Sequence, residues 1–204
     1  MHERHPTPSK EVIALLEPFD RLGMAQIELV ATAAQAERAM ETLASAQVLG
    51  FDTESKPTFV RNEVSDGPHV VQLATAQHAF VFQLRDATCS GLLGELLADE
   101  SIVKVGFGLG DDRRRITRKL GLEPQGVLDL NSLFWQRGYR KDMGVKGAVA
   151  VVFNRRFIKS RKATTSNWAQ LQLTEAQLVY AANDAYAAMR VFAALQSQPG
   201  GNEP

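Results

Sequence analysis

The sequence predicts a single α/β domain with a mixed five-stranded sheet, flanked by helices on both faces. Three apolar segments, at residues 48–54, 70–75 and 79–83, are separated by turn-forming residues and predict three successive antiparallel strands. Beyond the third strand, helical patterns alternate with predicted strands at 102–105 and 127–130, which favours parallel additions to the sheet. With 204 residues, 45% of them hydrophobic, the chain can bury one sizeable core.

The elements before the first central strand follow from local signals. Residues 1–10 are polar and rich in proline, so we expect disorder there, followed by a short helix at 11–16. Residues 26–30 have the composition of a short strand. Thr32 is placed to cap a helix over 33–46, in which small and apolar residues recur at helical spacing.

The C-terminal half is mainly helical. Apolar periodicity predicts helices over residues 88–97, 112–120, 130–137 and 145–152. After a basic loop at 154–166, Thr174 opens a last helix, which runs to about Leu195 before Gln-Pro-Gly-Gly ends it. We therefore expect an N-terminal extension at 1–25, one domain at 26–196 and a flexible tail at 197–204.

The composition indicates a globular protein in a reducing compartment. No apolar segment approaches the length of a membrane span, and the first residues lack the apolar region of a secretory signal. The single cysteine, Cys89, cannot form an internal disulfide, and with four scattered histidines it gives no zinc-binding spacing. We expect a cytoplasmic location and no membrane partner.

Charge is distributed unevenly, although the formal net charge is zero. Residues 1–100 hold 7 Lys/Arg against 15 Asp/Glu, whereas residues 101–164 hold 15 against 5. A basic segment in an otherwise acidic chain is typical of a surface that meets phosphates, and it is equally compatible with solvated helix faces. The basic residues cluster at Arg113–Arg115, then at Arg137, Arg140 and Lys141, then at Arg155, Arg156, Lys159, Arg161 and Lys162.

Two carboxylates end the first central strand. Side chains alternate along a strand, so Asp52 and Glu54 point to the same face, while Phe51 and Thr53 point to the other. Two like charges side by side favour a bound cation, because buried carboxylates need a partner or a metal. The simpler alternative is a strand that ends in solvent.

The strand at 102–105 leads into Gly106-Phe-Gly108-Leu-Gly110-Asp111-Asp112 and then a helix. This order is similar to the glycine fingerprint of dinucleotide sites, but Asp111 stands where the third glycine belongs. Two carboxylates at the position of a phosphate argue for a metal, with a helix cap as the alternative role for one of them. In the last helix, Tyr180 and Asp184 share one face through their i, i+4 spacing, which also suits a core-edge tyrosine and a solvated aspartate.

The order of these motifs resembles the tyrosine-bearing branch of the DEDD superfamily of 3′→5′ exonucleases. This branch includes the Werner-syndrome-type exonuclease domain, RNase D and the proofreading domain of family A DNA polymerases. The resemblance covers about residues 26–196, and its most specific part is Ser166-Asn-Trp168 followed by Tyr180-x-x-x-Asp184.

The resemblance implies an RNase H-like fold and a two-metal site. Its ligands are expected to be Asp52, Glu54, Asp112 and Asp184, binding two Mg²⁺ or Mn²⁺ ions, and the role of Tyr180 is to orient the attacking water. Asp112 is preferred over Asp111 because its distance from the glycines matches the family. Where the histidine branch has its histidine this chain has Val179, and where relatives often place tryptophan after the second acid it has Ser55.

We therefore expect a metal-dependent exonuclease that releases nucleoside 5′-monophosphates from the 3′ end of DNA. The basic segment is expected to guide a single strand, with Phe59, Phe107 and Trp168 as candidates to contact the terminal base, although Trp168 better suits packing beneath the last helix. The nearest alternative is an RNase D-like ribonuclease, which is disfavoured because no C-terminal helicase-and-ribonuclease-D domain follows residue 196. Two further functions are compatible with the sequence: a catalytically silent nucleic-acid-binding module, and a nicotinamide or flavin enzyme built on the glycines.

Overall fold

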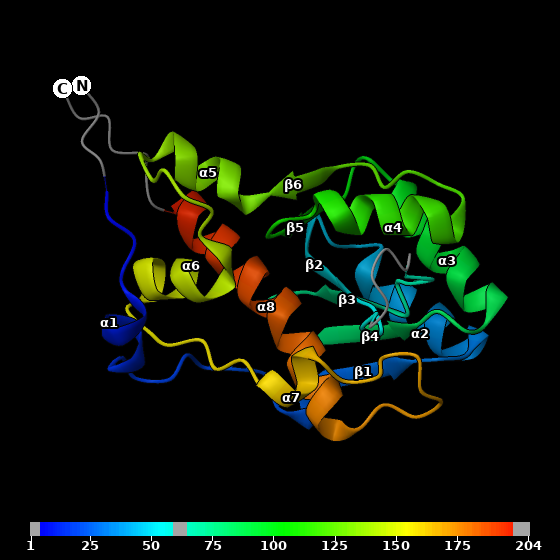
Figure 1. The fold of residues 1–204 in the computed structure, drawn as a ribbon. Coiled ribbons are helices and arrows are strands. Elements are labelled where there is room, and N and C mark those ends of the chain that lie inside the picture. Colours follow the sequence, from blue (N-terminus) through cyan, green and yellow to red (C-terminus); the bar gives the residue numbers. More distant parts are fainter. Residues whose placement is uncertain (1–4, 59–64, 198–204) are drawn as a thin grey trace.

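The computed structural model describes residues 5–58 and 65–197, and it confirms an α/β architecture with helices on both faces of one mixed sheet (Figure 1). The strands are β1 (Ile27–Val30), β2 (Val48–Glu54), β3 (Val70–Ala74), β4 (Ala79–Gln83), β5 (Val103–Gly106) and β6 (Val127–Asp129). Their order across the sheet is β1-β4-β3-β2-β5-β6, which places β2 near the centre.

The predicted count of five strands was wrong by one, because β1 joins the sheet beside β4. The meander β2-β3-β4 is antiparallel, and β5 and β6 add in parallel, as the sequence predicts. In contrast, β1 pairs in parallel with β4, with Ile27 opposite Ala79. A four-residue strand whose partner lies far along the chain has no local turn signal, so the sequence indicated the strand but not its place.

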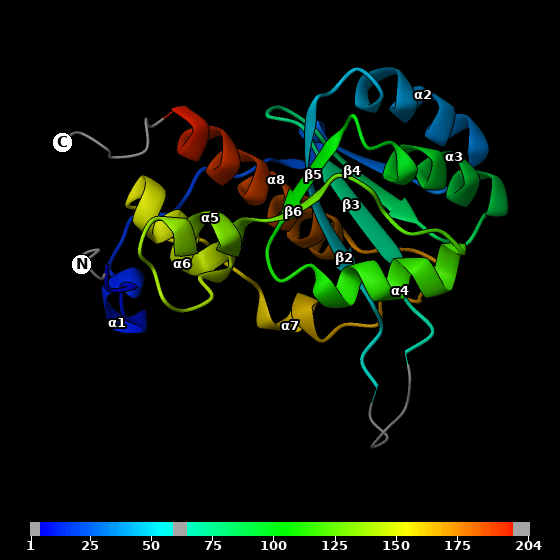
Figure 2. The ribbon, with the colours of Figure 1, turned by 90° about the horizontal axis from the view of Figure 1, so that it is seen from above.

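The helices form two layers around the sheet, as Figure 2 shows from above. One face is covered by α2 (Ala33–Leu43), α3 (Ala87–Ala98) and α4 (Gly110–Leu120), which share a core with Leu49, Phe51 and Leu73 of the sheet. The other face carries the second core and four further helices: α5 (Leu130–Gln136), α6 (Gly144–Phe153), α7 (Arg161–Thr164) and α8 (Glu175–Ser197).

Local signals account for most helix boundaries. The Thr32 side chain accepts a hydrogen bond from the Gln35 N–H at the start of α2, and Asp86 caps α3 in the same way. The short α1 (Lys10–Ala14) and the 3₁₀ turn η1 (Met24–Gln26) precede β1, and α7 lies within the predicted basic loop. In the described part of the chain, no helix combines the length and apolarity needed to cross a bilayer.

The long helix α8 lies against β2 at unusually close range, and Gly50 allows this approach. A Cβ atom at Gly50 would lie 1.9 Å from the Ala185 carbonyl oxygen and 2.8 Å from its carbonyl carbon. Both atoms belong to the helix backbone, so no side-chain rotation could relieve the overlap. The absence of a side chain at Gly50 therefore fixes the depth at which α8 packs, one residue away from Asp184.

A buried lysine on β5 makes a separate, testable contribution to stability. The ammonium of Lys104 donates to the Asp99 carbonyl at 2.6 Å and to the Leu96 carbonyl at 3.4 Å, at the C-terminal end of α3. Burial lowers the pKa of Lys104 to about 8. Between pH 8 and its ordinary pKa of about 10.5, the unfolded chain holds this proton and the folded chain does not, so stability rises with pH.

We therefore expect the free energy of unfolding of the wild type, relative to Lys104→Met, to increase by about 2 kcal/mol as the pH rises from 8 to 10.5. Urea unfolding of both proteins at several pH values in this range measures the difference, and the comparison cancels the titration of all other groups. A difference that stays constant with pH would contradict this account.

Candidate metal centre

Strand β2 presents two carboxylates on the face that α8 covers. Gly50, Asp52 and Glu54 alternate with Phe51, which packs in the opposite core. Across the antiparallel pair, Asp52 stands opposite Gln72 of β3, whose side chain is fully buried. The Gln72 carboxamide has no hydrogen-bond partner among the described residues, so an unpaired polar group lies beside the carboxylates.

Helix α8 brings Tyr180 and Asp184 to the same place. Both are buried, at 7% and 4% exposure, so the solvated role for Asp184 does not hold. Next to Asp184, the Asn183 carboxamide donates to the Leu22 carbonyl at 3.1 Å and accepts from the Leu22 N–H at 2.8 Å. These two bonds fix the rotation of α8 about its axis, which keeps Asp184 directed at β2.

Three of the four predicted ligands converge. One carboxylate oxygen from each of Asp52, Glu54 and Asp184 lies within 4.8 Å of the others. The Oδ1 atom of Asp184 is buried and accepts no hydrogen bond from the described residues. Hard divalent cations prefer carboxylate oxygens, so this donor set fits Mg²⁺ or Mn²⁺.

The electrostatics of the cluster point the same way. Burial, followed by the charges of Asp184 and Asp112, raises the pKa of Asp52. Burial and the neighbouring charge of Asp52 raise the pKa of Glu54 to about 9, and burial raises that of Asp184. Acids held this close favour protonation unless a cation compensates their charge.

The fourth predicted ligand, Asp112, lies at the start of α4 and is turned toward a different partner. It is 9% exposed and accepts a hydrogen bond from the Thr53 hydroxyl, on the far side of β2 from Asp184. Its charge still raises the pKa of Asp52, so it lies within electrostatic reach of the cluster. Asp111 is exposed and paired with Arg114.

The glycines before α4 serve packing. A Cβ atom at Gly106 would lie 2.3 Å from the Phe51 carbonyl oxygen, so β5 ends in close contact with β2. Gly108 has a φ of +68°, a conformation that favours glycine and turns the chain into α4. The resemblance of this segment to a dinucleotide fingerprint is therefore explained by close approach and turning.

Sequence reasoning missed Lys159 as a component of the site. Its ammonium lies 2.6 Å from Asp184 Oδ2 and 5.0 Å from the centre of the Tyr180 ring. The Tyr180 hydroxyl also accepts a hydrogen bond from Thr164 at 3.1 Å. Lys159 belongs to an irregular segment without periodicity, so only its position inside the basic region could have drawn attention to it.

The other predicted contact residues divide into structural and exposed groups. Arg137 donates to the Leu133 and Leu195 carbonyls, and Arg156 donates to the Ala14 carbonyl, so both support the fold. Trp168 is 1% exposed and packs against the Tyr180 ring, with centroids 5.8 Å apart. Phe107 is half-buried, and Phe59 lies outside the described residues. Of the clustered basic residues, those that are exposed are Arg114, Arg140, Lys141, Arg155, Arg161 and Lys162.

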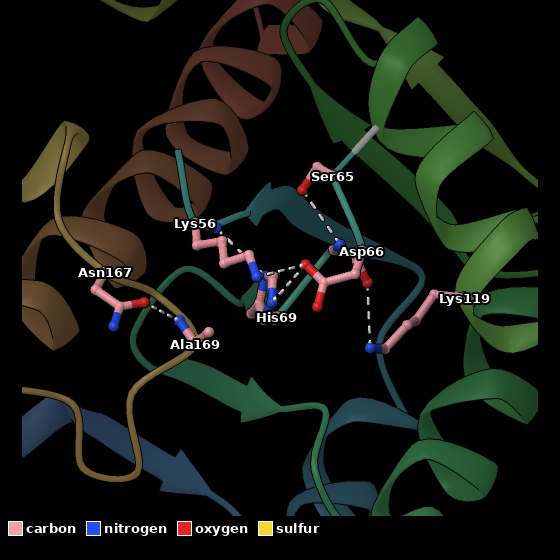
Figure 3. Close-up of polar contacts among 8 residues, drawn as sticks. Lys56, Ser65, Asp66, His69, Lys119, Asn167 and Ala169 are labelled. Atoms are coloured by element: carbon pink, nitrogen blue, oxygen red, sulfur yellow. Dashed lines mark hydrogen bonds and ion pairs between the residues drawn. The ribbon is translucent and has the colours of Figure 1, made fainter. Parts of the chain in front are cut away.

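The loop that follows Glu54 is held by a polar cluster, drawn in Figure 3. The Asp66 carboxylate lies 3.3 Å from both Lys56 Nζ and His69 Nε2, and Lys119 of α4 donates to the Asp66 carbonyl at 3.2 Å. Ser55, at the start of the loop, packs against Gly67, where a Cβ atom would lie 2.3 Å from its hydroxyl oxygen. The described parts of the loop are thereby tied to the last turn of α4.

The chain is similar in sequence to known 3'-5' exonucleases. A 3'-5' exonuclease of Arabidopsis thaliana is 27% identical over 153 residues, which cover 74% of this chain and 53% of that protein. The Mus musculus bifunctional 3'-5' exonuclease/ATP-dependent helicase WRN is 27% identical over 153 residues, covering 74% of this chain and 11% of the relative. This chain thus spans about half of the first relative and a small part of the second.

The fold is also similar to solved structures. RNase D of Trypanosoma brucei in complex with RNA superposes with a TM-score of 0.73 at 21% identity, covering 92% of this chain and 65% of that one. A family model described as 3'-5' exonuclease matches residues 27–199, which is most of the chain. The protein therefore belongs to the 3'-5' exonuclease family.

Proposed function

We propose that this protein is a 3′→5′ exonuclease that hydrolyses DNA from its 3′ end and releases nucleoside 5′-monophosphates with two bound Mg²⁺ or Mn²⁺ ions. The observation that carries the proposal is the convergence of Asp52 and Glu54 from β2 with Asp184 from α8, in a chain that belongs to the 3'-5' exonuclease family. Asp112 is the proposed fourth ligand.

The residues present suit divalent cations. The buried Oδ1 of Asp184 lacks a hydrogen bond from the described residues, and the acids are forced together by two rigid elements. Such cations, when bound between carboxylates, activate a water molecule and offset the charge on the departing O3′. The chain's own contribution is to hold the carboxylates in register, exclude bulk water behind α8 and orient the nucleophilic water.

Tyr180 is proposed to orient that water. Burial raises its pKa to about 12, so the phenol stays neutral at physiological pH and can donate a hydrogen bond but cannot serve as a base. Tyr180→Phe removes this hydrogen bond and keeps the ring against Trp168, so kcat should fall by about 10- to 100-fold with little change in stability. Single-turnover kinetics with saturating Mn²⁺ measure the effect, and an unchanged kcat would contradict this role.

The proposal also specifies the class of substrate, which is DNA. The mouse relative is named as a 3'-5' exonuclease joined to a helicase, while the trypanosome structure is named as an RNase D bound to RNA. An RNase D-like activity on RNA is therefore the second candidate, although the likeness to RNase D supports the fold alone.

The deciding experiment uses 5′-labelled single-stranded DNA and RNA of identical sequence with Mn²⁺ and with Mg²⁺. The proposal predicts a descending ladder of products, release of 5′-monophosphates and a higher kcat/KM on DNA. Faster shortening of RNA would favour the second candidate. Binding of both oligonucleotides without any metal-dependent shortening would instead establish a silent binding module.

A further inference from the structure

Lys159 is placed differently from the basic residues around it. Arg155, Arg161 and Lys162 are exposed, whereas the Lys159 side chain is 26% exposed and its ammonium reaches the carboxylate of Asp184, which is 2% exposed. A buried ion pair of this kind needs a reason, because desolvation of both groups opposes it.

The backbone around Lys159 is fixed on both sides. Phe157 is buried in the core that α8 shares, and the Ser160 side chain accepts a hydrogen bond from the Ala163 N–H at the start of α7. Before Phe157, α6 ends at Phe153, with Asn154 as its C-cap. The ammonium is therefore carried by a flexible four-carbon stem from a fixed backbone position beside the acid cluster.

The Lys159 ammonium lies where a cation that compensates the acid cluster is expected. It acts electrostatically on Asp52, Glu54 and Asp184 together, and the charge of Asp184 raises the pKa of Lys159 despite its burial. The group is therefore a permanent positive charge at the acid cluster. Divalent ions held by the same carboxylates would compete with this ammonium for Asp184, because like charges at such range repel strongly.

We propose that Lys159 is a catalytic residue: its ammonium, which pairs with Asp184 in this structure, contacts a non-bridging oxygen of the scissile phosphate in the substrate complex. This inference rests on the proposed exonuclease function. Four carboxylates and two divalent ions balance in charge, so the phosphodiester anion, and the additional negative charge that develops on it, is left for Lys159 to stabilise.

In the reaction, the oxygen of water forms the new bond to phosphorus, and the bond from phosphorus to O3′ breaks. The electron pair stays on O3′, which takes up a proton from solvent, while the proton lost by the attacking water passes to solvent. Lys159 keeps its proton throughout. Its part is to hold the phosphate oxygen and to stabilise negative charge as the new bond forms.

The alternative is that Lys159 merely neutralises the charge of Asp184 until metal binds. The two accounts differ once metal is present, because a counter-ion that metal has displaced no longer matters to the rate. Lys159→Met keeps the length of the stem and removes the charge, and Lys159→Gln keeps a polar end if the methionine variant does not fold by circular dichroism. Lys10→Met, an exposed lysine of α1, is the matched control for the loss of one positive charge.

The experiment has two readouts. Calorimetric titration with Mn²⁺ alone should give a Kd at least about tenfold lower for Lys159→Met than for the wild type and for Lys10→Met, because the competing ammonium is gone. Degradation of single-stranded DNA at saturating Mn²⁺ should nevertheless show a kcat about 10²-fold lower for Lys159→Met, with a smaller change in KM. Lys159→Arg should restore part of that loss.

Two results would overturn the inference while leaving the proposed function intact: wild-type kcat for Lys159→Met at saturating Mn²⁺, or unchanged Mn²⁺ affinity. Failure of the proposed function would give a different result. In that case the wild type itself binds Mn²⁺ and shortens neither DNA nor RNA, which removes the catalytic role of Lys159 as well.

Discussion

Asp184→Asn should lower the rate of DNA degradation by at least about 10³-fold, which corresponds to about 4 kcal/mol of transition-state stabilisation. The carboxamide has the same shape as the carboxylate, so the packing of α8 is retained. It cannot supply the anionic oxygen that joins Asp52 and Glu54 around a cation. Asp184→Asn also removes a charge that repels Asp52 and Glu54, but it leaves Lys159 without its ion-pair partner, so the two effects on the stability of the metal-free protein oppose each other.

The measurements are single-turnover degradation across a series of Mn²⁺ concentrations and calorimetric Mn²⁺ binding. Asp111→Asn is the matched control, since Asp111 is an exposed acid paired with Arg114 and should leave both quantities unchanged. Asp52→Ala is expected to behave like Asp184→Asn. Substantial turnover by Asp184→Asn at saturating Mn²⁺ would exclude Asp184 as a ligand.

Gly50→Ala should destabilise the protein by about 3 kcal/mol and lower kcat by about 10²-fold. The added methyl group meets the backbone of Ala185 at 1.9 Å, so α8 must move away from β2 to accommodate it. Asp184 precedes Ala185 in the helix and moves with it, and a displacement of about 1 Å at a reacting centre is enough for a loss of this size.

Urea unfolding and single-turnover kinetics give the two values. Gly91→Ala provides the control, because Gly91 lies in α3 and a Cβ atom there meets nothing within 4 Å. That variant should be slightly more stable than the wild type, by about 0.5–1 kcal/mol, and fully active. If Gly50→Ala is as stable and as active as Gly91→Ala, the close contact between α8 and β2 does not position the site.

Features with a local or periodic signal were predictable. The central strand, the meander and α8 follow from alternation, turn residues and the Thr174 cap, and the resemblance to 3′→5′ exonucleases is confirmed by the family model. The ligand set came from that resemblance; the structure brings Asp52, Glu54 and Asp184 together and buries Asp112. The roles of these residues, the domain limits and the cytoplasmic location stay predictions.

Features that depend on contacts between distant segments were not predictable. Nothing in the sequence near Ile27 indicates that β1 pairs with β4, and nothing near Lys159 indicates that it reaches Asp184. The hydrogen bond from Thr53 to Asp112 is a further case. Alternation along β2 correctly places Thr53 on the face opposite Asp52, but it does not indicate that Asp112 of α4 is the partner. Such contacts arise from packing, which a one-dimensional pattern does not encode.

The two bonds between Asn183 and Leu22 have a consequence for where the functional unit begins. The family model starts at residue 27, yet Leu22 is 2% exposed and its backbone is held beside Asp184. The same N-terminal segment also contacts the segment that carries Lys159, because the Phe19 N–H donates to the Arg156 carbonyl at 3.0 Å. A truncated protein that starts at residue 27 would lose the hydrogen bonds of Leu22 and Phe19. Helix α8 and the segment that carries Lys159 would then lack these contacts.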